Sequence, residues 1–243
     1  MFKKKYMAIL AAAVCLLNLS ACSDEKKSSD GSSFSVGENG LTEIITPEEG
    51  SQEYELGSYR VSEKGTKLYY DSEQVPDELM LALESYFMSF QDKDFAAYKN
   101  SLAFDYAERY EEYLQKDYSY GLDNSFDIQC GNIRDSMKCE ITGEYDASEI
   151  DDYSGDFTIT RVKADLPELA EGETIEDRTK EFFSYLDKIF EMDYYEYIKE
   201  QADDIKYLTF YIIAKGEDGE EHRIISGVDI VFAEKDGKYY TFG

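Results

Sequence analysis

The sequence has no tryptophan, only three prolines and a single histidine among its 243 residues. Nucleophilic catalysis with an imidazole base would depend on His222, whose place beside a predicted turn is typical of an exposed loop residue. Zinc sites built from histidine and cysteine need more such ligands than the chain offers. Glycine motifs that hold nucleotide phosphates are also absent. The motifs therefore identify no catalytic residue, no cofactor and no metal site.

Acidic residues are in large excess. The chain carries 53 Asp and Glu against 25 Lys and Arg, a formal net charge of −28. This charge opposes binding to nucleic acid or to anionic lipid, because such binding depends on Lys and Arg that neutralise phosphates. It is compatible with cationic partners or bound calcium, but a solvated surface explains most of it.

The only long apolar run lies at the N-terminus. Residues 7–17 follow three lysines, Lys3 to Lys5. The run is shorter than the roughly 20 residues that span a bilayer, and its length and flanks are typical of a signal-peptide core. It ends in Leu19, Ser20, Ala21 and Cys22, which resembles the bacterial lipobox. An ordinary cleaved signal with an unrelated cysteine is the alternative.

The lipobox resemblance implies that Cys22 receives a diacylglyceryl group and becomes the first residue after cleavage. Two acyl chains hold a protein stably on a membrane. We therefore expect a leader over residues 1–21 and a protein anchored on the extracytoplasmic face of the cell membrane. Residues 22–53 are polar and rich in Ser, Asp and Glu, which is typical of a flexible tether. Residues 54–243 are expected to form one globular domain.

Two further cysteines, Cys130 and Cys139, remain in this domain. An extracytoplasmic setting and their close spacing favour a disulfide, which would need the two residues to lie across a hairpin. Two free thiols are the alternative.

The pattern of apolar residues predicts an α+β domain. We expect a hairpin over residues 59–70, a helix opening at Pro76, a second helix from Phe95 and an amphipathic stretch over residues 104–114. A capping box at Thr174 to Asp177 indicates one long helix to about residue 201. The expected strands cover residues 126–130, 137–145, 156–162, 207–215, 223–233 and 238–242.

The paired opening helices, over residues 83–90 and 94–98, and the closing strand pair that ends at residues 236–240 resemble NTF2-like (cystatin-like α+β cone) domains. These domains are common in lipoproteins of Gram-positive bacteria. The resemblance implies N-terminal helices packed on a curved antiparallel sheet. The front hairpin and the inserted long helix depart from the family pattern. The family implies no single function, because the cone hosts enzymes, assembly modules and binding domains.

Carboxylates supply the remaining candidate sites. Asp229 lies mid-strand, and in such a cone an inward carboxylate could act as a general base if burial raised its pKa. An outward, solvated Asp229 is the alternative. The acidic cluster from Asp146 to Asp156 lacks the alternation of a calcium loop, so a solvated loop is the simpler interpretation.

The sequence is compatible with three functions. The first is a non-catalytic domain that binds a small-molecule ligand or a protein, with no nucleic acid involved. The second is an isomerase or hydratase that uses Asp229 in a cone pocket. The third is an accessory subunit of an envelope complex that docks through the helix bearing Tyr194, Tyr195 and Tyr197. Exposed tyrosines suit protein contacts, and Tyr118 and Tyr120 are further candidates.

Overall fold

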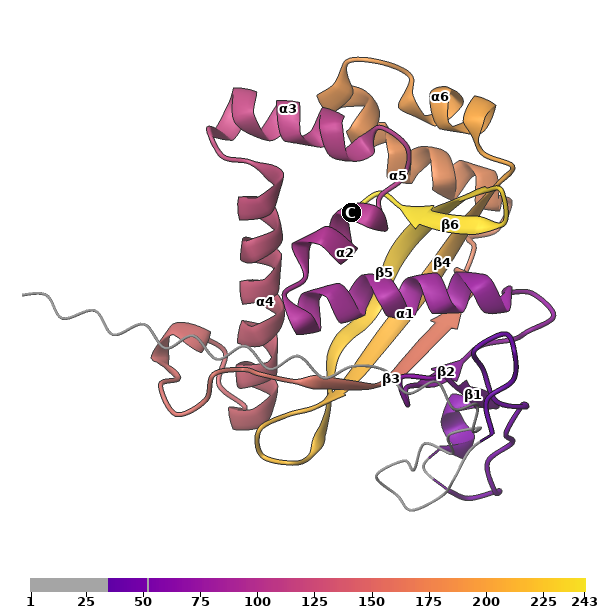
Figure 1. Ribbon diagram of the computed structural model, residues 1–243, viewed down its shortest axis with the longest axis vertical. Helices are drawn as coiled ribbons and strands as arrows, with labels where there is room; N and C mark the ends of the chain where they lie inside the picture. The colour runs from indigo at the N-terminus through magenta and orange to yellow at the C-terminus, as the bar shows by residue number, and fades with distance from the viewer. Residues whose placement is uncertain (1–34, 52) are drawn as a thin grey trace, which may run out of the picture. The chain divides into compact units, whose positions relative to one another are not determined.

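The structure is a computed structural model that describes residues 35–51 and 53–243, and these form one compact unit. Its helices are α1 (Asp77–Asp92), α2 (Phe95–Asn100), α3 (Tyr106–Tyr118), α4 (Leu122–Thr142), α5 (Ile175–Phe190) and α6 (Tyr194–Gln201), with short 3-10 helices η1 (Tyr54–Leu56) and η2 (Ala147–Glu149). Its strands are β1 (Tyr59–Val61), β2 (Lys67–Tyr69), β3 (Thr158–Asp165), β4 (Asp204–Lys215), β5 (Glu221–Lys235) and β6 (Lys238–Thr241). Together these elements confirm the expected α+β class (Figure 1).

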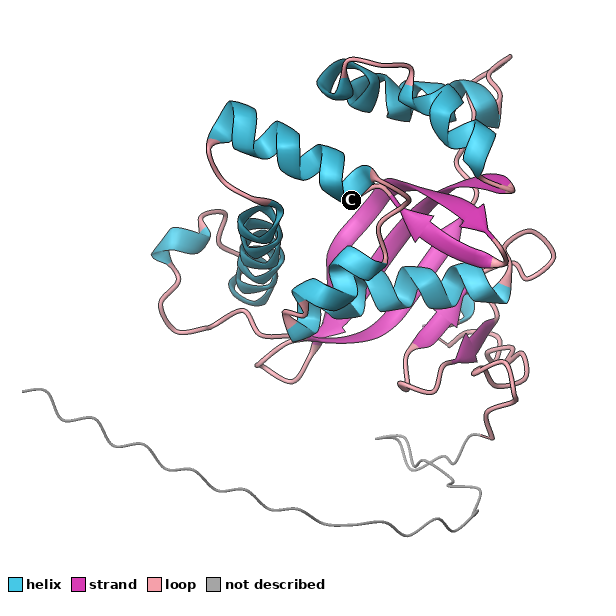
Figure 2. Cartoon of the chain, turned by 45° about the horizontal axis from the view of Figure 1, so that its top comes forward, coloured by secondary structure: helices cyan, strands magenta, loops and turns pink. Residues whose placement is uncertain are grey.

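The six strands form one curled sheet in the order β1 to β6. Neighbouring strands are antiparallel except β2 and β3, which are parallel, so the sheet is mixed rather than wholly antiparallel. A parallel pair needs a long crossover. Here helices α1 to α4 supply it, and Figure 2 shows them gathered around the sheet.

Two helices lie against opposite faces of the sheet. Along β4, buried Phe210 alternates with Thr209 and Tyr211 on the other face, as strand geometry requires. The ring of Phe87 in α1 lies 4.7 Å from that of Phe210, centroid to centroid. Phe182 in α5 lies 6.5 Å from Tyr207 on the other face. We call these the α1 face and the α5 face.

Helix α1 forms where the sequence predicts it. Pro76 precedes its first turn in extended conformation, and Asp77 and Glu78 place negative charge at the positive end of the helix dipole. Its buried apolar residues are Leu79, Met80, Leu83, Tyr86, Phe87, Met88 and Phe90, while Leu81 and Ala82 are half-buried. The helix ends at Lys93, which takes the left-handed conformation.

Two of the expected strands are wrong, because their residues lie in helix α4. Residues 126–130 and most of 137–145 belong to this single helix. Its buried apolar residues are Leu122, Phe126, Cys130 and Met137. Those spacings of four, four and seven follow the helical period, which short apolar runs conceal when each is considered alone.

The long helix expected after Thr174 is two helices. The capping box at Thr174 and Asp177 opens α5 as predicted. The chain then turns at Glu191, with a positive φ of 54°, and Asp193 caps α6 by accepting from the backbone N–H of Glu196. Asp187 accepts hydrogen bonds from the backbone N–H groups of α6 at Tyr194 and Tyr195, which fixes the break.

The folded unit begins earlier than the expected boundary at residue 54. Leu41 is 1% exposed and bridges to Ser62, while Ile45 bridges to Tyr59. The backbone N–H of Val61 donates to the hydroxyl of Thr42 at 2.9 Å. This segment therefore covers the outer edge of β1, which would otherwise present unpaired backbone groups.

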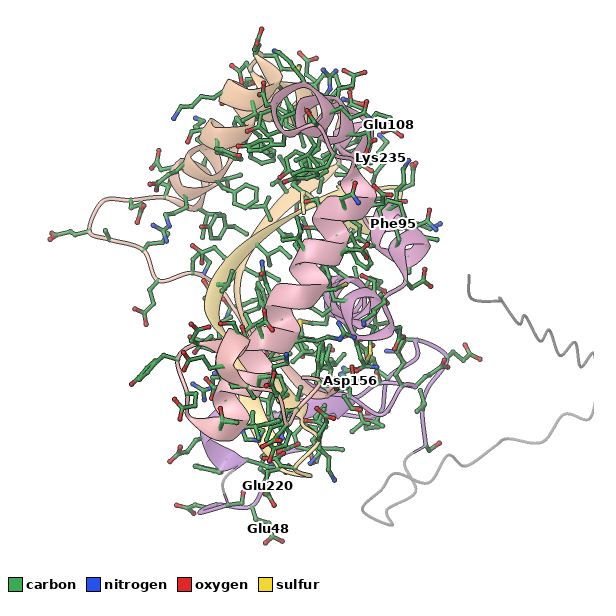
Figure 3. The ribbon with its side chains drawn as sticks, turned by 90° about the vertical axis from the view of Figure 1, so that its left-hand side faces the viewer. Glu48, Phe95, Glu108, Asp156, Glu220 and Lys235 are labelled. Carbon is green, nitrogen blue, oxygen red and sulfur yellow. The ribbon has the colours of Figure 1, made fainter. Side chains whose placement is uncertain are left out.

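Charged side chains crowd the surface of the unit. Figure 3 shows them projecting outward, with Glu48, Glu108 and Glu220 at its periphery. Within the described residues, none of the helices combines the length and the apolar character that a membrane crossing requires.

Candidate functional site

The register of the sheet brings residues distant in sequence into two neighbouring rows on the α5 face. One row runs Arg161, Ile213, Arg223 across β3, β4 and β5. The next runs Tyr69, Lys163, Tyr211 across β2, β3 and β4. Side chains one row apart on a sheet face are within reach of each other.

These six residues line a cavity of about 250 Å³ on the α5 face. Its remaining wall is η1, which contributes Glu55 and Leu56. The lining therefore carries three cationic side chains against one carboxylate. This is the reverse of the whole chain, where acidic residues outnumber basic ones two to one.

Two of the three cations are held by carboxylates outside the cavity wall. The Nη2 atom of Arg161 lies 2.6 Å from Glu221 and 3.8 Å from Glu53. Lys163 lies 3.2 Å from Asp165. These ion pairs fix the direction of the long side chains and leave part of their donor capacity unused.

Arg223 differs from the other arginines. The chain has six, all within the described residues, and five pair with Asp or Glu. Among the residues that the structure describes, no carboxylate lies within ion-pair distance of Arg223. Its guanidinium lies instead over the ring of Tyr211, 5.6 Å from the centroid. Stacking of this kind leaves all the N–H groups of the guanidinium free to donate hydrogen bonds.

Tyr69 adds a second donor at the cavity wall. Its side chain is 0% exposed, and its hydroxyl has no hydrogen-bond partner within the described part of the chain. Burial, followed by the nearby charge of Glu53, raises the pKa of Tyr69 above its ordinary value. The hydroxyl is thus a protonated donor, and a buried polar group left without a partner is rare in native proteins.

Asp229, the candidate general base, lies on the α5 face beside α5. Its Oδ2 accepts from the hydroxyl of Tyr207 at 2.6 Å, and its Oδ1 from that of Thr209 at 2.7 Å. Arg178 lies 3.3 Å from Oδ2. Burial and the hydrogen bond to Asp229 raise the pKa of Tyr207. Both oxygens of Asp229 are thus engaged, and it is neither freely solvated nor directed into the cavity.

The cysteines of the expected disulfide lie on one helix instead of across a hairpin. Cys130 and Cys139 are nine positions apart in α4, and both thiols are free. Nine residues of α-helix rise about 13 Å, whereas a disulfide joins Cα atoms roughly 4.4–6.8 Å apart. The folded helix therefore keeps the two sulfurs from pairing. Burial raises the pKa of the Cys130 thiol, which makes it less reactive.

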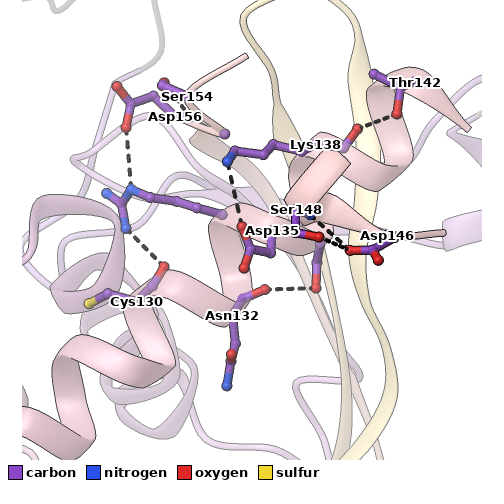
Figure 4. Close-up of polar contacts among 12 residues, drawn as sticks. Cys130, Asn132, Asp135, Lys138, Thr142, Asp146, Ser148, Ser154 and Asp156 are labelled. Atoms are coloured by element: carbon purple, nitrogen blue, oxygen red, sulfur yellow. Dashed lines mark hydrogen bonds and ion pairs between the residues drawn. The ribbon is translucent and has the colours of Figure 1, made fainter. Parts of the chain in front are cut away.

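The acidic cluster from Asp146 to Asp156 is dispersed among local contacts (Figure 4). Asp146 accepts from the backbone and hydroxyl of Ser148, and this hydrogen bonding lowers the Asp146 pKa. Asp156 pairs with Arg134 at 3.3 Å. Over residues 35–51 and 53–243, no group of three or more acidic, His or Cys side chains converges to hold a metal ion.

The tyrosines singled out in the sequence divide into buried and exposed ones. Tyr194 and Tyr195 are buried, and the hydroxyl of Tyr197 donates to Asp105 at 2.9 Å. Tyr118 is 55% exposed and donates to or accepts from Tyr113 at 3.3 Å. Tyr194 and Tyr195 therefore pack the fold, and Tyr197 is half-buried.

Cys22 and the lipobox lie outside the described residues. Comparison with known proteins adds no relative: no family model, no curated protein and no solved structure matches the chain.

The cavity is not apparent from the sequence. Its residues come from four strands and η1, and only the register joins them. One signal was present: Arg161 and Lys163 alternate with buried Val162, so they share a face. Nothing in the sequence indicates that Arg223 and Tyr69 lie on the same face.

Proposed function

We propose that this protein is a lipid-anchored binding protein of the extracytoplasmic face, and that its folded unit holds a small ligand in the cavity of the α5 face. The observation that carries the proposal is the cavity itself. It combines apolar Leu56 and Ile213 with a few polar donors, a composition typical of ligand sites.

Binding without chemistry is favoured by what the cavity contains. No nucleophile paired with a base lies among its lining residues, and Asp229 has both oxygens occupied by Tyr207, Thr209 and Arg178. A general base needs an oxygen within reach of the substrate proton. We therefore assign Asp229 a positioning role between β5 and α5.

The anchor part of the proposal rests on the lipobox resemblance at Cys22. Cys22→Ala should abolish fatty-acid labelling of the protein and leave its precursor uncut or release it from the membrane. Ser20→Thr offers a matched control that changes the neighbouring sequence but keeps the thiol. Unchanged labelling in the Cys22→Ala variant would contradict the lipoprotein assignment.

The binding part is tested by filling the cavity. Ile213→Trp places a large ring among the lining side chains while keeping an apolar residue on the strand. The full chain, purified in detergent and incubated with a small-molecule extract of envelope and medium, is compared with this variant by native mass spectrometry. We expect a bound mass in the wild-type protein that the variant lacks. Identical spectra would contradict the proposal.

A further inference from the structure

We infer that the ligand carries a carboxylate or phosphate group, which is bound between Arg161, Lys163 and Arg223 and accepts a hydrogen bond from Tyr69. This inference rests on the proposed function and adds the chemical class of the ligand. Its starting point is Arg223, an arginine that has no carboxylate partner among the described residues and stacks on Tyr211 instead.

The free donors of Arg223 support an anion. Among the described residues no carboxylate lies within ion-pair distance of Arg223, whereas Glu221 and Asp165, which pair with Arg161 and Lys163, are not part of the cavity lining. The planar fork of arginine matches the oxygens of carboxylate and phosphate with two parallel hydrogen bonds. Arg223, stacked on Tyr211, is oriented to make that contact at little entropic cost.

The Tyr69 hydroxyl is the independent observation. It is fully buried, borders the same cavity and lacks an acceptor among the described residues. Burial is the largest cause that raises the pKa of Tyr69, the charge of Glu53 follows, and Arg161 acts in the opposite direction, so the hydroxyl lies within the electrostatic reach of Arg161. A ligand oxygen would satisfy this donor.

The apolar part of the wall limits what else the ligand carries. Leu56 lines the cavity from η1, Ile213 lies in the row between Arg161 and Arg223, and Glu55 adds one negative charge to the lining. A fully hydrophilic polyanion would meet that carboxylate and two apolar side chains. A ligand with one anionic group and a small uncharged body fits a volume of about 250 Å³ better.

The experiment uses the arginines as reporters. With only six in the chain, their Nε–Hε signals can be followed one by one in NMR spectra of the full chain in detergent. The probes are inorganic phosphate, succinate and the neutral analogue succinamide at fixed ionic strength. We expect phosphate, succinate or both to move the signals of Arg161 and Arg223, while Arg60 and Arg109 stay in place.

Three variants assign the effect to the cavity. Arg223→Gln should weaken binding of the active probe about tenfold or more, since charge-assisted hydrogen bonds are among the strongest. Tyr69→Phe should weaken it about fivefold, yet leave the unliganded protein at least as stable, because it removes a hydroxyl that has no hydrogen-bond partner in the part of the chain that the structure describes. Arg178→Gln, on the same face but paired with Asp229 outside the cavity, should leave the affinity unchanged.

The outcomes distinguish a phosphate ligand from a carboxylate ligand, and they distinguish failure of the anion inference from failure of the proposed binding function. Binding of phosphate alone indicates a phosphate-bearing ligand, and binding of succinate alone indicates a carboxylate. Equal responses to succinate and succinamide, or uniform shifts of all six arginines, would overturn the inference. A neutral molecule displaced by Ile213→Trp would leave the binding function standing while the anion inference fails. Absence of any bound molecule and of any probe response would overturn both.

Discussion

The hydroxyl of Ser62 donates a hydrogen bond of 2.6 Å to Oε1 of Glu84, and both side chains are almost fully buried, at 3% and 1% exposed. Ser62 closes the turn between β1 and β2, where its N–H also bonds to the carbonyl of Thr66. Glu84 lies in the middle of α1. This contact attaches the front hairpin to the first helix, and β2 in turn carries Tyr69 to the cavity.

Ser62→Ala should destabilise the protein by about 1.5 to 3 kcal/mol, because the buried carboxyl group of Glu84 would lose a hydrogen-bond donor. Urea unfolding followed by circular dichroism measures the change. Ser58→Ala, which removes an exposed hydroxyl on the same segment, is the control and should cost less than about 0.5 kcal/mol. Equal urea midpoints for the two variants would contradict a stabilising role for the hydrogen bond between Ser62 and Glu84.

Gly155→Ala should be among the most damaging small substitutions in the chain. Gly155 has a φ of 77°, and a Cβ there would lie 2.3 Å from the backbone carbonyl oxygen of Arg134. Positive φ and a clash with backbone in α4 together cost about 2 to 4 kcal/mol.

Gly131→Ala is the matched control for this prediction. Gly131 lies inside α4, where an added Cβ meets no atom within 4 Å. Alanine is the better helix former, so this variant should be more stable by about 0.5 to 1 kcal/mol. Thermal melts that shift in the same direction for both variants would show that the packing of Gly155 on α4 is not as described.

The buried tyrosines predict cooperative unfolding in alkali. Burial is the largest cause that raises the pKa of Tyr86, Tyr98, Tyr106 and Tyr194. A pKa raised in the folded state stabilises the fold below the unfolded value, about 10 for tyrosine, and this stabilisation is lost as the pH rises above that value.

Tyrosinate absorbance followed against pH tests this expectation. The exposed tyrosines, such as Tyr118, should titrate first and gradually. The buried ones should titrate together with the loss of circular dichroism, while urea-unfolded protein should give one smooth curve. A single smooth curve for the native protein as well would contradict the burial of these side chains.

Local patterns predict much of this fold, and long-range pairing explains what they miss. The apolar period of α1 predicts that helix directly, and the turn residues between β4, β5 and β6 predict those three strands. The strand assignments within α4 were wrong because Phe126 and Met137 belong to one helical stripe that only appears over the whole segment. The cavity depends on the register of β2, β3, β4 and β5, so Tyr69 and Arg223 meet through pairing that no local pattern encodes.

Asp229→Asn separates a positioning role from an acid–base role. Asparagine keeps one oxygen to accept from Tyr207 or Thr209, and its amide can donate to the other hydroxyl, but the attraction to Arg178 is lost. Because the ion pair is partly solvated, its loss should destabilise the protein by only about 1 kcal/mol. The cavity residues Arg161 and Arg223 do not contact Asp229, so binding of phosphate or succinate should be unchanged. Thermal melting and the arginine NMR titration measure both quantities on the same sample. A variant that melts like the wild type but no longer supports the protein's function in the cell would point to proton transfer at Asp229 and to an enzyme.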